Sequence, residues 1–526
     1  MIFSSAIFLF FFAVVFVVHW YVLPAVPERY RLKANHVFLL ITSYAFYMNW
    51  DWRFGFLIAF STLVDFACGL YMQRLDDNAG ATNAPTDATG GDTRRRVALI
   101  ISLVTNLGVL GYFKYADFFI GSFVDLANLL VPGTYGADER DSLLLKVILP
   151  LGISFFTFQS MSYTIDVFRR VIPVERSLLR FALFVSFFPQ LVAGPIVTAK
   201  TFLPQLDRLP EFDLERMRVA ARWFALGFFK KTVLADNMAP IVDQIYATPE
   251  AFGTAVHWIG AFGFWVQVYC DFSGYSDMAW GTALFLGYRL PENFRMPYLS
   301  RSVTEHWQRW HMSLIGWIRD YLYIPLGGNR VGFLRHKLNV FLTMFLAGLW
   351  HGANWTFIVW GSIHGTILTL EATWRQYWAD RQPAGSRPQA ETPSSLIERI
   401  GTWPLIILKV CVTSFCTVFF GTMFRSQNIA DSFLILGRML GFEMGHVIYS
   451  NIVYTPAYSF DDMLRPVVFA SLTVIVGHML GHYIFDKKTL RPRIPVWLEL
   501  VFYPVFVLAC VQLGAPDVQA FIYFVF

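Results

Sequence analysis

The chain has 526 residues, of which 56% are hydrophobic and 18% aromatic, and only 15% carry a charge. Soluble domains carry about 25% charged residues, so this composition excludes an ordinary soluble protein and indicates a chain that crosses a membrane several times. The net charge of +5 is modest and no basic stripe accompanies a nucleic-acid-binding motif, so we expect no nucleic-acid partner. The cysteines lie mostly in apolar runs without CxxC spacing, which predicts packing residues: Cys68, Cys270, Cys411, Cys416 and Cys510.

The N-terminal segment 1–24 is predicted to be a retained first transmembrane helix. It has about 23 apolar residues, and it lacks the basic start and small-residue cleavage site of a removed signal peptide. The polar segment 73–96 is rich in Ala, Gly, Thr and Asp, which predicts a flexible loop, and the cluster Arg94–Arg96 predicts a cytoplasmic position. Other apolar runs in this half of the chain lie at 36–50, 54–72, 97–112, 115–131 and 146–167.

Polar residues inside later apolar runs indicate helices that face protein and not lipid. The run 179–196 contains Pro189 and Pro195, which predict a kink or break at membrane depth. The run 146–167 is polar enough to face the protein interior through Ser154, Thr157, Gln159 and Ser162.

Two carboxylates, Asp271 and Asp277, lie in the long apolar run 255–288. Carboxylates are costly at membrane depth unless they are paired or line a cavity. Two interpretations remain open for them, a pair at a helix end or interface and a wall of a tunnel. Neither residue is expected to be catalytic.

The segment 301–365 concentrates the polar chemistry of the chain. Charged and aromatic residues alternate from Thr304 to Leu322, which predicts a helix too charged to cross a bilayer freely. Pro325 and the pair Gly327–Gly328 predict a turn, and an apolar run then leads to His351. Five of the 11 histidines fall in these 65 residues: His306, His311, His336, His351 and His364.

His351 is the first candidate for chemistry, with His311 forty residues earlier as a second imidazole. Imidazole is well suited to take a proton from a hydroxyl near neutral pH, but a packed histidine that donates to a carbonyl explains the same residue, and both interpretations remain open. A zinc site is disfavoured because His306 and His311 would lie roughly 140° apart on a helix, at about 100° per residue. No histidine precedes an Asp by five positions, and neither a GxSxG nor a phosphate-binding glycine motif occurs.

The C-terminal part is separated by a Pro- and Ser-rich charged linker, predicted at 373–402. The predicted domains are thus a core at 1–372 and C-terminal transmembrane helices at 403–526. Asp461 and Asp462 are expected in a long polar loop. In total the sequence predicts an all-α polytopic membrane protein with roughly 11 to 13 transmembrane or re-entrant helices.

Several long strings resemble the membrane-bound O-acyltransferases, and within them the bacterial branch that acetylates alginate. These strings are YCDFSGYSDMAWGTALFLGYRLPENFRMPYLS, RWHMSL, RDYLYIPLGGNR and GLWHGANWTFIVWG, with earlier matches at 150–170, 187–196 and 227–239. The resemblance covers roughly residues 1 to 370 well. It implies a bundle of helices around a central tunnel, with the catalytic core in 1–372.

The resemblance assigns two histidines a role. The family's essential tunnel histidine in LWHG corresponds to His351, and the histidine of RRWH corresponds to His311. This chain departs from the usual FWRRWH, with His306 in place of Phe and Gln308 in place of Arg, and His306 receives no role.

Further positions match family motifs and are candidates for donor binding or tunnel lining. Arg319, Asp320, Tyr323 and Asn329 would form a cytoplasmic floor near the donor, and an Arg–Asp network that holds an interfacial helix is an equal alternative. The full candidate set is Trp310, Arg319, Asp320, Tyr323, Asn329, Trp350 and Asn354.

The function implied by the resemblance is O-acetylation of an exopolysaccharide such as alginate from the inner membrane of a bacterium. The implied acyl donor is acetyl-CoA, with no bound cofactor and no metal, and the implied partners are lipids, periplasmic acetyltransferase proteins and the polysaccharide. Cellulose or peptidoglycan acetylation and D-alanyl transfer to teichoic acid remain alternatives. A transporter with a histidine proton relay, and a scaffold that anchors a periplasmic acetyltransferase, remain open as other classes.

Overall fold

The structure, a computed structural model, describes residues 1–81, 90–379, 381, 396–442, 459–482, 495–515 and 519–522. These residues form helices and connecting turns, without a β-strand. The chain divides into two compact units. The first contains Met1–Gly227 and Tyr275–Pro291, and the second contains Phe228–Gly274 and Glu292–Ile522.

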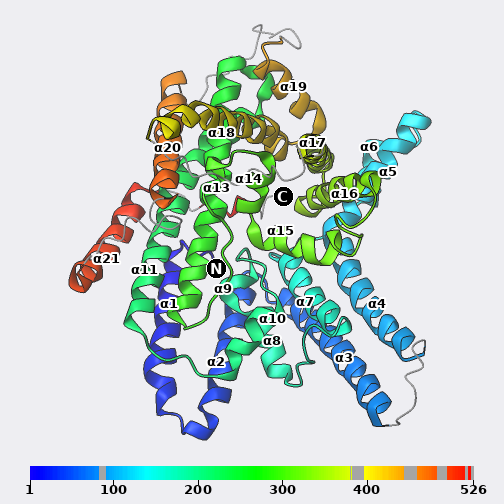
Figure 1. Ribbon diagram of the computed structural model, residues 1–526, viewed down its shortest axis with the longest axis vertical. Helices are drawn as coiled ribbons and strands as arrows, with labels where there is room; N and C mark the ends of the chain where they lie inside the picture. Colours follow the sequence, from blue (N-terminus) through cyan, green and yellow to red (C-terminus); the bar gives the residue numbers. More distant parts are fainter. Residues whose placement is uncertain are drawn as a thin grey trace. The chain divides into compact units, whose positions relative to one another are not determined.

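In the first unit, helices α1 to α5 have 12 to 29 residues and helices α6 to α11 have 4 to 16 (Figure 1). They are α1 (Ala6–Val17), α2 (Glu28–Met48), α3 (Arg53–Ala81), α4 (Gly90–Leu110), α5 (Ala116–Leu130), α6 (Ala137–Leu143), α7 (Ile153–Phe168), α8 (Leu178–Ser186), α9 (Phe188–Leu191), α10 (Ala199–Phe202) and α11 (Leu214–Phe229). The break between α8 and α9 lies next to Pro189, as predicted.

Helices of the second unit begin with α12, and α13 is shared by both units along its length. They are α12 (Asp236–Ala247), α13 (Thr254–Phe285), α14 (Val303–Arg309), α15 (Met312–Ile318), α16 (Phe333–His351), α17 (Trp355–Ala379), α18 (Leu396–Arg425), α19 (Ile429–Met439), α20 (Phe460–Gly481) and α21 (Val496–Leu513). Shorter π and 3₁₀ turns are η1 (Val18–Val22), η2 (Leu23–Ala25), η3 (Gly111–Tyr115), η4 (Leu203–Asp207), η5 (Lys230–Ala235), η6 (Pro249–Ala251), η7 (Pro297–Leu299) and η8 (Arg319–Tyr323).

Five helical segments of the described chain are long and apolar enough to cross a membrane. Helical structure is expected there because a lipid-embedded backbone must satisfy its hydrogen bonds within the segment. The predicted all-α polytopic membrane fold is confirmed. The segments are Ala6–Ala25, Arg53–Asn78, Thr93–Leu130, Trp403–Arg425 and Phe460–Gly481.

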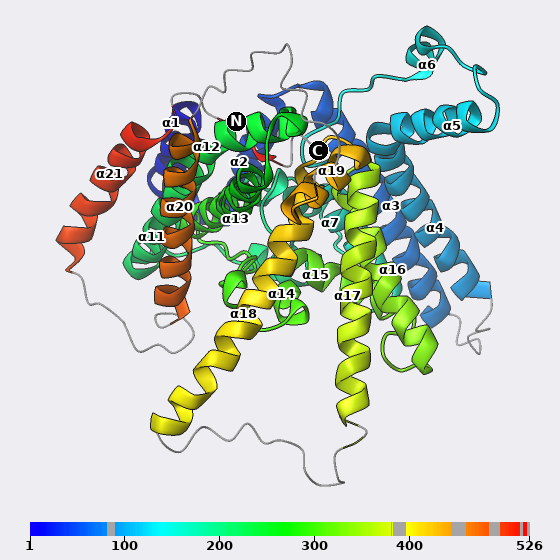
Figure 2. The same ribbon diagram turned by 90° about the horizontal axis from the view of Figure 1, so that it is seen from above.

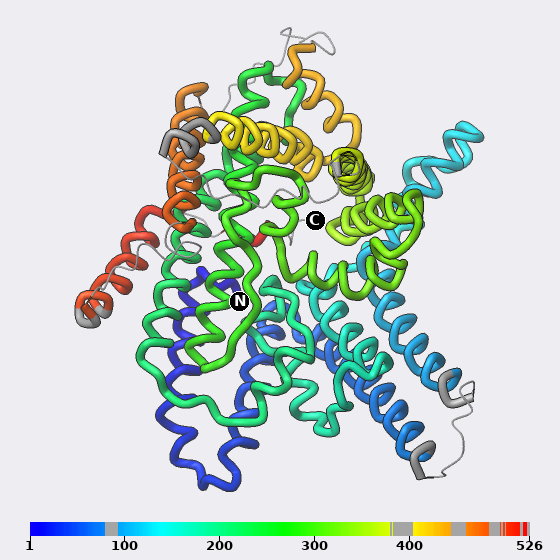
Figure 3. The backbone as a smooth tube through the Cα atoms, viewed as in Figure 1, coloured from blue at the N-terminus to red at the C-terminus, as the bar shows by residue number. Residues whose placement is uncertain are grey.

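Helices α3, α4 and α7 pack against one another in the first unit (Figure 3). The buried carboxylate of Asp65 joins them. The Nδ2 of Asn106 donates to both oxygens of Asp65, at 3.0 and 2.9 Å. Hydroxyl groups of Ser102, Ser160 and Thr164 donate to the same carboxylate. The side chains predicted to face the protein interior in the run 146–167 are all buried, as expected: Ser154, Thr157, Gln159 and Ser162. The residues of α7 that bind Asp65 are two others, Ser160 and Thr164.

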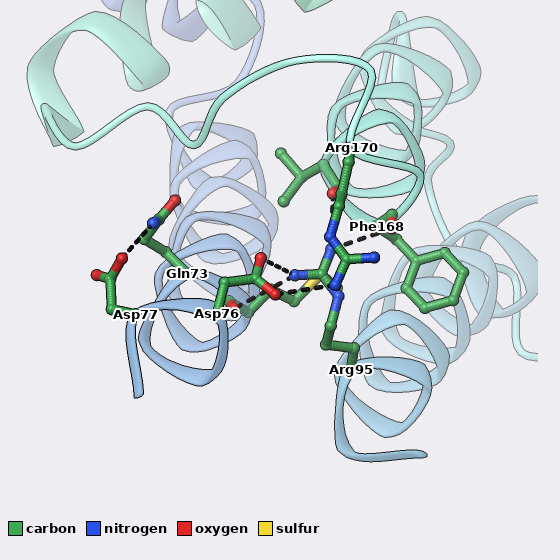
Figure 4. Close-up of polar contacts among 8 residues, drawn as sticks. Gln73, Asp76, Asp77, Arg95, Phe168 and Arg170 are labelled. Atoms are coloured by element: carbon green, nitrogen blue, oxygen red, sulfur yellow. Dashed lines mark hydrogen bonds and ion pairs between the residues drawn. The ribbon is translucent and has the colours of Figure 1, made fainter. Parts of the chain in front are cut away.

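The ends of α3 and α4 are held together by Arg95, whose side chain is only 2% exposed. Its guanidinium pairs with Asp76 and donates to the carbonyl oxygens of Val167 and Phe168, at 2.9 and 3.0 Å (Figure 4). The exposed Arg170 contacts the same carboxylate at 3.0 Å. This cluster, Arg95, Asp76 and Arg170, closes one end of the helix group.

The prediction of a flexible loop at 73–96 is wrong at both of its ends. α3 continues to Ala81 and α4 begins at Gly90, because Arg95 and Asp76 pair between the helices and Gln73 donates to Asp77 one turn later. Residues 82–89 lie outside the described part of the chain.

Two predictions about the C-terminal part are corrected by the structure. Asp461 and Asp462 lie in the first turn of α20 and not in a loop, because Ser459 and Asp462 form reciprocal capping bonds that start the helix. The linker predicted at 373–402 is wrong at both ends, because residues 373–379 belong to α17 and residues 396–402 belong to α18, and residues 380 and 382–395 lie outside the described part of the chain.

Candidate active site

Close contact between α16 and α17 sets the position of His351. The two helices lie side by side (Figure 2). A Cβ atom at Gly348 would lie 2.4 Å from the Phe357 carbonyl oxygen, and one at Gly361 would lie 2.6 Å from the Met344 carbonyl oxygen. Only glycine permits this backbone approach, which is typical of tightly packed membrane helices. His351 is the last residue of α16, beside the start of α17.

Aromatic rings surround the His351 imidazole, which is 4% exposed. The ring centroids of Trp350, Trp360 and Phe424 lie 5.0, 5.5 and 5.1 Å from it. The His311 centroid lies 6.4 Å away. Two buried imidazoles from separate segments therefore meet in an apolar setting.

His311 lies at a break that the sequence pattern did not predict. The expected helix from Thr304 to Leu322 divides into α14 and α15, and His311 adopts φ 44° and ψ 50° between them. The Met312 N–H donates to the Asn293 carbonyl oxygen at 2.9 Å, so the backbone leaves the helical hydrogen-bond pattern here. This left-handed conformation is rare for a residue with a side chain, and strained backbone is concentrated at functional sites.

Asn293 determines the protonated nitrogen of His311. Its Oδ1 atom lies 3.1 Å from His311 Nδ1 and also accepts from the Ser313 N–H at 3.3 Å and the Ser313 hydroxyl at 2.9 Å. Because the Ser313 N–H can only donate, this Asn293 atom is the oxygen, and His311 Nδ1 carries the proton. The lone pair of His311 therefore resides on Nε2.

Burial also lowers the pKa of the His311 imidazole, which belongs to the short α14–α15 segment outside the candidate membrane spans, and nearby His351 lowers it further. His311 is thus held neutral. The sequence analysis missed Asn293, because PENF carries no motif that indicates a histidine partner.

Two of the tryptophan candidates lie next to these histidines. The Trp350 centroid is 6.0 Å from that of His311 and 5.0 Å from that of His351. Trp310 is buried, and it stacks on His306 with centroids 5.6 Å apart. His306 itself contacts the Pro297 carbonyl oxygen through Nδ1 at 3.3 Å.

The remaining candidates lie in the connection before α16 or at the start of α17. Arg319 and Asp320 form an exposed ion pair at 2.7 Å, which fits the structural alternative for this pair. Tyr323 lies in η8 with its ring 6.5 Å from that of His336, and Asn329 is exposed. Asn354 accepts from the Thr356 N–H and donates to the Gln427 carbonyl oxygen, so it fixes the start of α17.

Comparison with known proteins agrees with this architecture. The family model of the membrane-bound O-acyltransferases matches residues 134–415. A probable alginate O-acetylase of Pseudomonas putida is 36% identical over 528 residues, which cover 100% of both chains. The chain belongs to the membrane-bound O-acyltransferase family. It is therefore an acyltransferase.

Other relatives of this acyltransferase carry related names. A probable alginate O-acetylase of Azotobacter vinelandii is 41% identical over 401 residues, 76% of this chain and 74% of the relative. A peptidoglycan O-acetyltransferase of Helicobacter pylori is 33% identical over 396 residues, 70% of each chain.

The acyltransferase also contains a buried ion-pair group near His311. Lys231 Nζ lies 2.6 Å from Asp271 Oδ1 and 2.7 Å from Asp236 Oδ1, and the three side chains are buried. Asp271 is thus paired, as one of the two interpretations from the sequence expected, but it lies in the middle of α13 and not at a helix end. The next residue, Phe272, contacts the His311 ring edge-to-face at 4.6 Å.

The C-terminal segment 519–522 is bound to this group. Lys231 Nζ donates to the Gln519 carbonyl oxygen at 3.0 Å, and Asp271 Oδ2 accepts from the Ile522 N–H at 2.6 Å. The described residues contain no group of three or more His, Cys, Asp or Glu side chains arranged to hold a metal ion.

Proposed function

We propose that this acyltransferase passes acetyl groups from cytoplasmic acetyl-CoA, through a tunnel in the bacterial inner membrane, for O-acetylation of an exopolysaccharide of the alginate type. The names of the relatives that match most of the chain support the acetyl group and the polymer. The observation that carries the proposal is the meeting of two buried imidazoles, His351 and His311, with centroids 6.4 Å apart. Periplasmic acetyltransferase proteins are the proposed partners for delivery to the polymer.

The proposed reaction needs a single proton carrier. His351 takes the proton from the acceptor hydroxyl while the hydroxyl oxygen attacks the thioester carbonyl carbon. The C–S bond then breaks, and the proton passes from His351 to the leaving thiolate, so the products are an ester and free coenzyme A. His311, neutral with its lone pair on Nε2, assists at the same acyl group. The aromatic rings around His351 exclude water that would otherwise hydrolyse the thioester.

The test is an acetyl-ester assay on secreted polysaccharide from cells that carry His351→Ala, at wild-type membrane abundance of the protein. We expect the ester to fall at least about 100-fold, the lower range for loss of a general base. His336→Ala is the matched control, because His336 lies on the same helix but 15 residues before His351, about 22 Å away along the helix axis.

Full acetylation with His351→Ala would exclude the catalytic assignment and favour the scaffold interpretation. Ester on peptidoglycan or cellulose in place of the secreted polymer would replace the proposed acceptor but retain the enzyme class.

A further inference from the structure

A second group of buried side chains with polar atoms lies next to His351 and consists of Trp307, Trp360 and His364. Trp360 contacts His351 with ring centroids 5.5 Å apart, and it contacts His364 at 5.0 Å. Trp360 and His364 are four residues apart on α17 and therefore share one helix face. Trp307 of α14 packs against both, at 5.5 Å from Trp360 and 5.3 Å from His364. The proposed mechanism uses neither Trp307 nor His364.

Two polar atoms of this group lack a hydrogen-bond partner. They are Trp307 Nε1 and His364 Nδ1, in side chains that are only 7% and 1% exposed. A buried polar group without a partner destabilises the folded protein, so such groups are rare in native structures. Two such atoms on residues whose rings touch edge-to-face at 89° point to a ligand that both can bind.

The two atoms differ in the hydrogen bonds that they can form. An indole N–H only donates, whereas an imidazole nitrogen accepts when the proton is on the other nitrogen. Together they match a hydroxyl group, which accepts one hydrogen bond and donates another. The neighbouring His306 is not part of this pair, because its Nδ1 contacts the Pro297 carbonyl oxygen.

We propose that Trp307 and His364 form a binding subsite for a hydroxyl group, one aromatic ring beyond His351. An acceptor with two or more hydroxyl groups would be oriented by this subsite, because one hydroxyl bound there places another for attack at His351. This inference rests on the proposed function, because it concerns the acceptor of that reaction. An ordered water is the other source of the same chemistry, and the experiment separates the two.

Four variants of the full-length protein test the subsite. Trp307→Phe and His364→Phe keep an aromatic ring and remove the unpartnered nitrogen, and His364→Asn keeps a hydrogen-bonding group near the Nδ1 position. Trp258→Phe is the matched control, because the Trp258 Nε1 hydrogen bond to the Met439 carbonyl oxygen is already formed within the protein, at 3.0 Å. Acetyl ester on secreted polysaccharide is measured at equal membrane abundance, together with the unfolding temperature of each purified protein in detergent.

For Trp307→Phe and His364→Phe we expect about fivefold less ester, because each variant loses one neutral hydrogen bond to the acceptor. We expect the unfolding temperature of both variants to be unchanged or raised. His364→Asn retains more ester than His364→Phe. Trp258→Phe lowers the unfolding temperature, and its ester follows only the amount of folded protein.

Three outcomes overturn the subsite. A lower unfolding temperature with normal ester in Trp307→Phe and His364→Phe identifies a structural water. Normal ester together with a normal unfolding temperature shows that the two nitrogens bind no ligand. A fall in ester that only follows the amount of folded protein shows that the two side chains have a packing role. Failure of the proposed function is seen separately, as full ester with His351→Ala or as no ester above that of cells without the protein.

Discussion

The side chain of Asn293 decides which nitrogen of His311 can accept a proton. Its oxygen is fixed by two donors of Ser313, so it holds the proton of His311 on Nδ1 and leaves Nε2 basic. At the scale of single residues, the chemistry of this site therefore depends on an amide that makes no contribution as an acid or base. Its effect on His311 can be measured as a pH dependence.

Asn293→Asp places a carboxylate beside the same Nδ1–H. The negative charge favours the imidazolium, so it raises the pKa of His311 and protonates Nε2 at higher pH. Because protonated His311 cannot assist at the acyl group, we expect the acid limb of the pH profile of acetyl transfer to move to higher pH by about one unit. Initial rates of ester formation between pH 5 and 9 in membranes would measure this shift.

Asn428→Asp is the control for this substitution, because Asn428 is exposed at the N-cap of α19, where Asp also caps a helix. Loss of the hydrogen bond from Asn428 to Asp431 would lower stability but would not shift the pH profile. An unshifted profile in Asn293→Asp would mean that the protonation state of His311 does not limit the reaction.

At the scale of helices, glycines determine how closely α16 and α17 approach, and thereby where His351 lies. Gly348→Ala would place a methyl group 2.4 Å from a backbone oxygen of α17, so the helices must separate. We expect a loss of about 1 to 3 kcal/mol in stability, typical of overpacking, and reduced acetyl transfer. Thermal unfolding in detergent and the acetyl-ester assay measure the two effects.

Gly421→Ala is the matched control in α18, where a Cβ atom has no neighbour within 4 Å. Alanine there favours the helix by up to about 1 kcal/mol and leaves transfer unchanged. Equal behaviour of the two alanine variants would show that the α16–α17 crossing has space that the structure does not indicate.

Two arginines that share Asp76 allow a direct comparison of buried and exposed ion pairs. Arg95→Gln leaves the carbonyl oxygens of Val167 and Phe168 without their donor and Asp76 without its buried partner, so we expect a loss of about 3 kcal/mol. Arg170→Gln removes a side chain that is 66% exposed, and we expect a loss of at most about 1 kcal/mol. Denaturation of both variants in the same detergent would contradict the assignment if Arg170→Gln were the more destabilised.

Local patterns predicted the helices better than their interruptions. The apolar runs gave α7, α13 and the kink at Pro189, because burial and backbone hydrogen bonding act over a few turns. The break at His311 was not predictable, since the hydrogen bond that stabilises it comes from Asn293, 18 residues earlier. The helical ends of 73–96 were missed for the same reason, because Arg95 and Asp76 are 19 residues apart.

The sequence likewise predicted some residues of the candidate site and missed others. Motif resemblance selected His311 and His351, and the structure brings their rings within 6.4 Å. Arg319 and Asp320 belong to equally recognisable strings but form an exposed pair. Asn293, Trp307 and His364 gave no signal as partners, because their positions relative to the two histidines depend on helix packing.

At the scale of the whole molecule, Lys231 connects distant parts of the second unit. It binds carboxylates of α12 and α13 and the backbone of segment 519–522. Lys231→Met leaves two buried carboxylates without a cation, and we expect a loss of about 3 to 5 kcal/mol and faster hydrogen exchange of the Ile522 amide. Hydrogen exchange followed by mass spectrometry measures this, with Lys200→Met as an exposed control.

Adding Asp271→Asn to Lys231→Met removes one of the stranded charges and should recover part of the stability. If the double variant were as unstable as the single one, the loss would come from packing and not from charge.

The hydrogen bonds of Asp65 have a consequence for biosynthesis. Its partner Ser160 follows 95 residues later in the chain. A ribosome that adds about 5 to 20 residues per second needs roughly 5 to 20 s to reach it. During that time the carboxylate of α3 has only its partners in α4, Ser102 and Asn106, which follow 37 and 41 residues after it. Because hydrocarbon does not tolerate an incompletely satisfied carboxylate, we expect α3 to stay with α4 in the insertion machinery until α7 emerges. Crosslinking of stalled nascent chains at position 65 would detect the delay, and Asp65→Asn would shorten it. Asp65 thus links the rate of protein synthesis to the order in which the helices of this unit enter the bilayer.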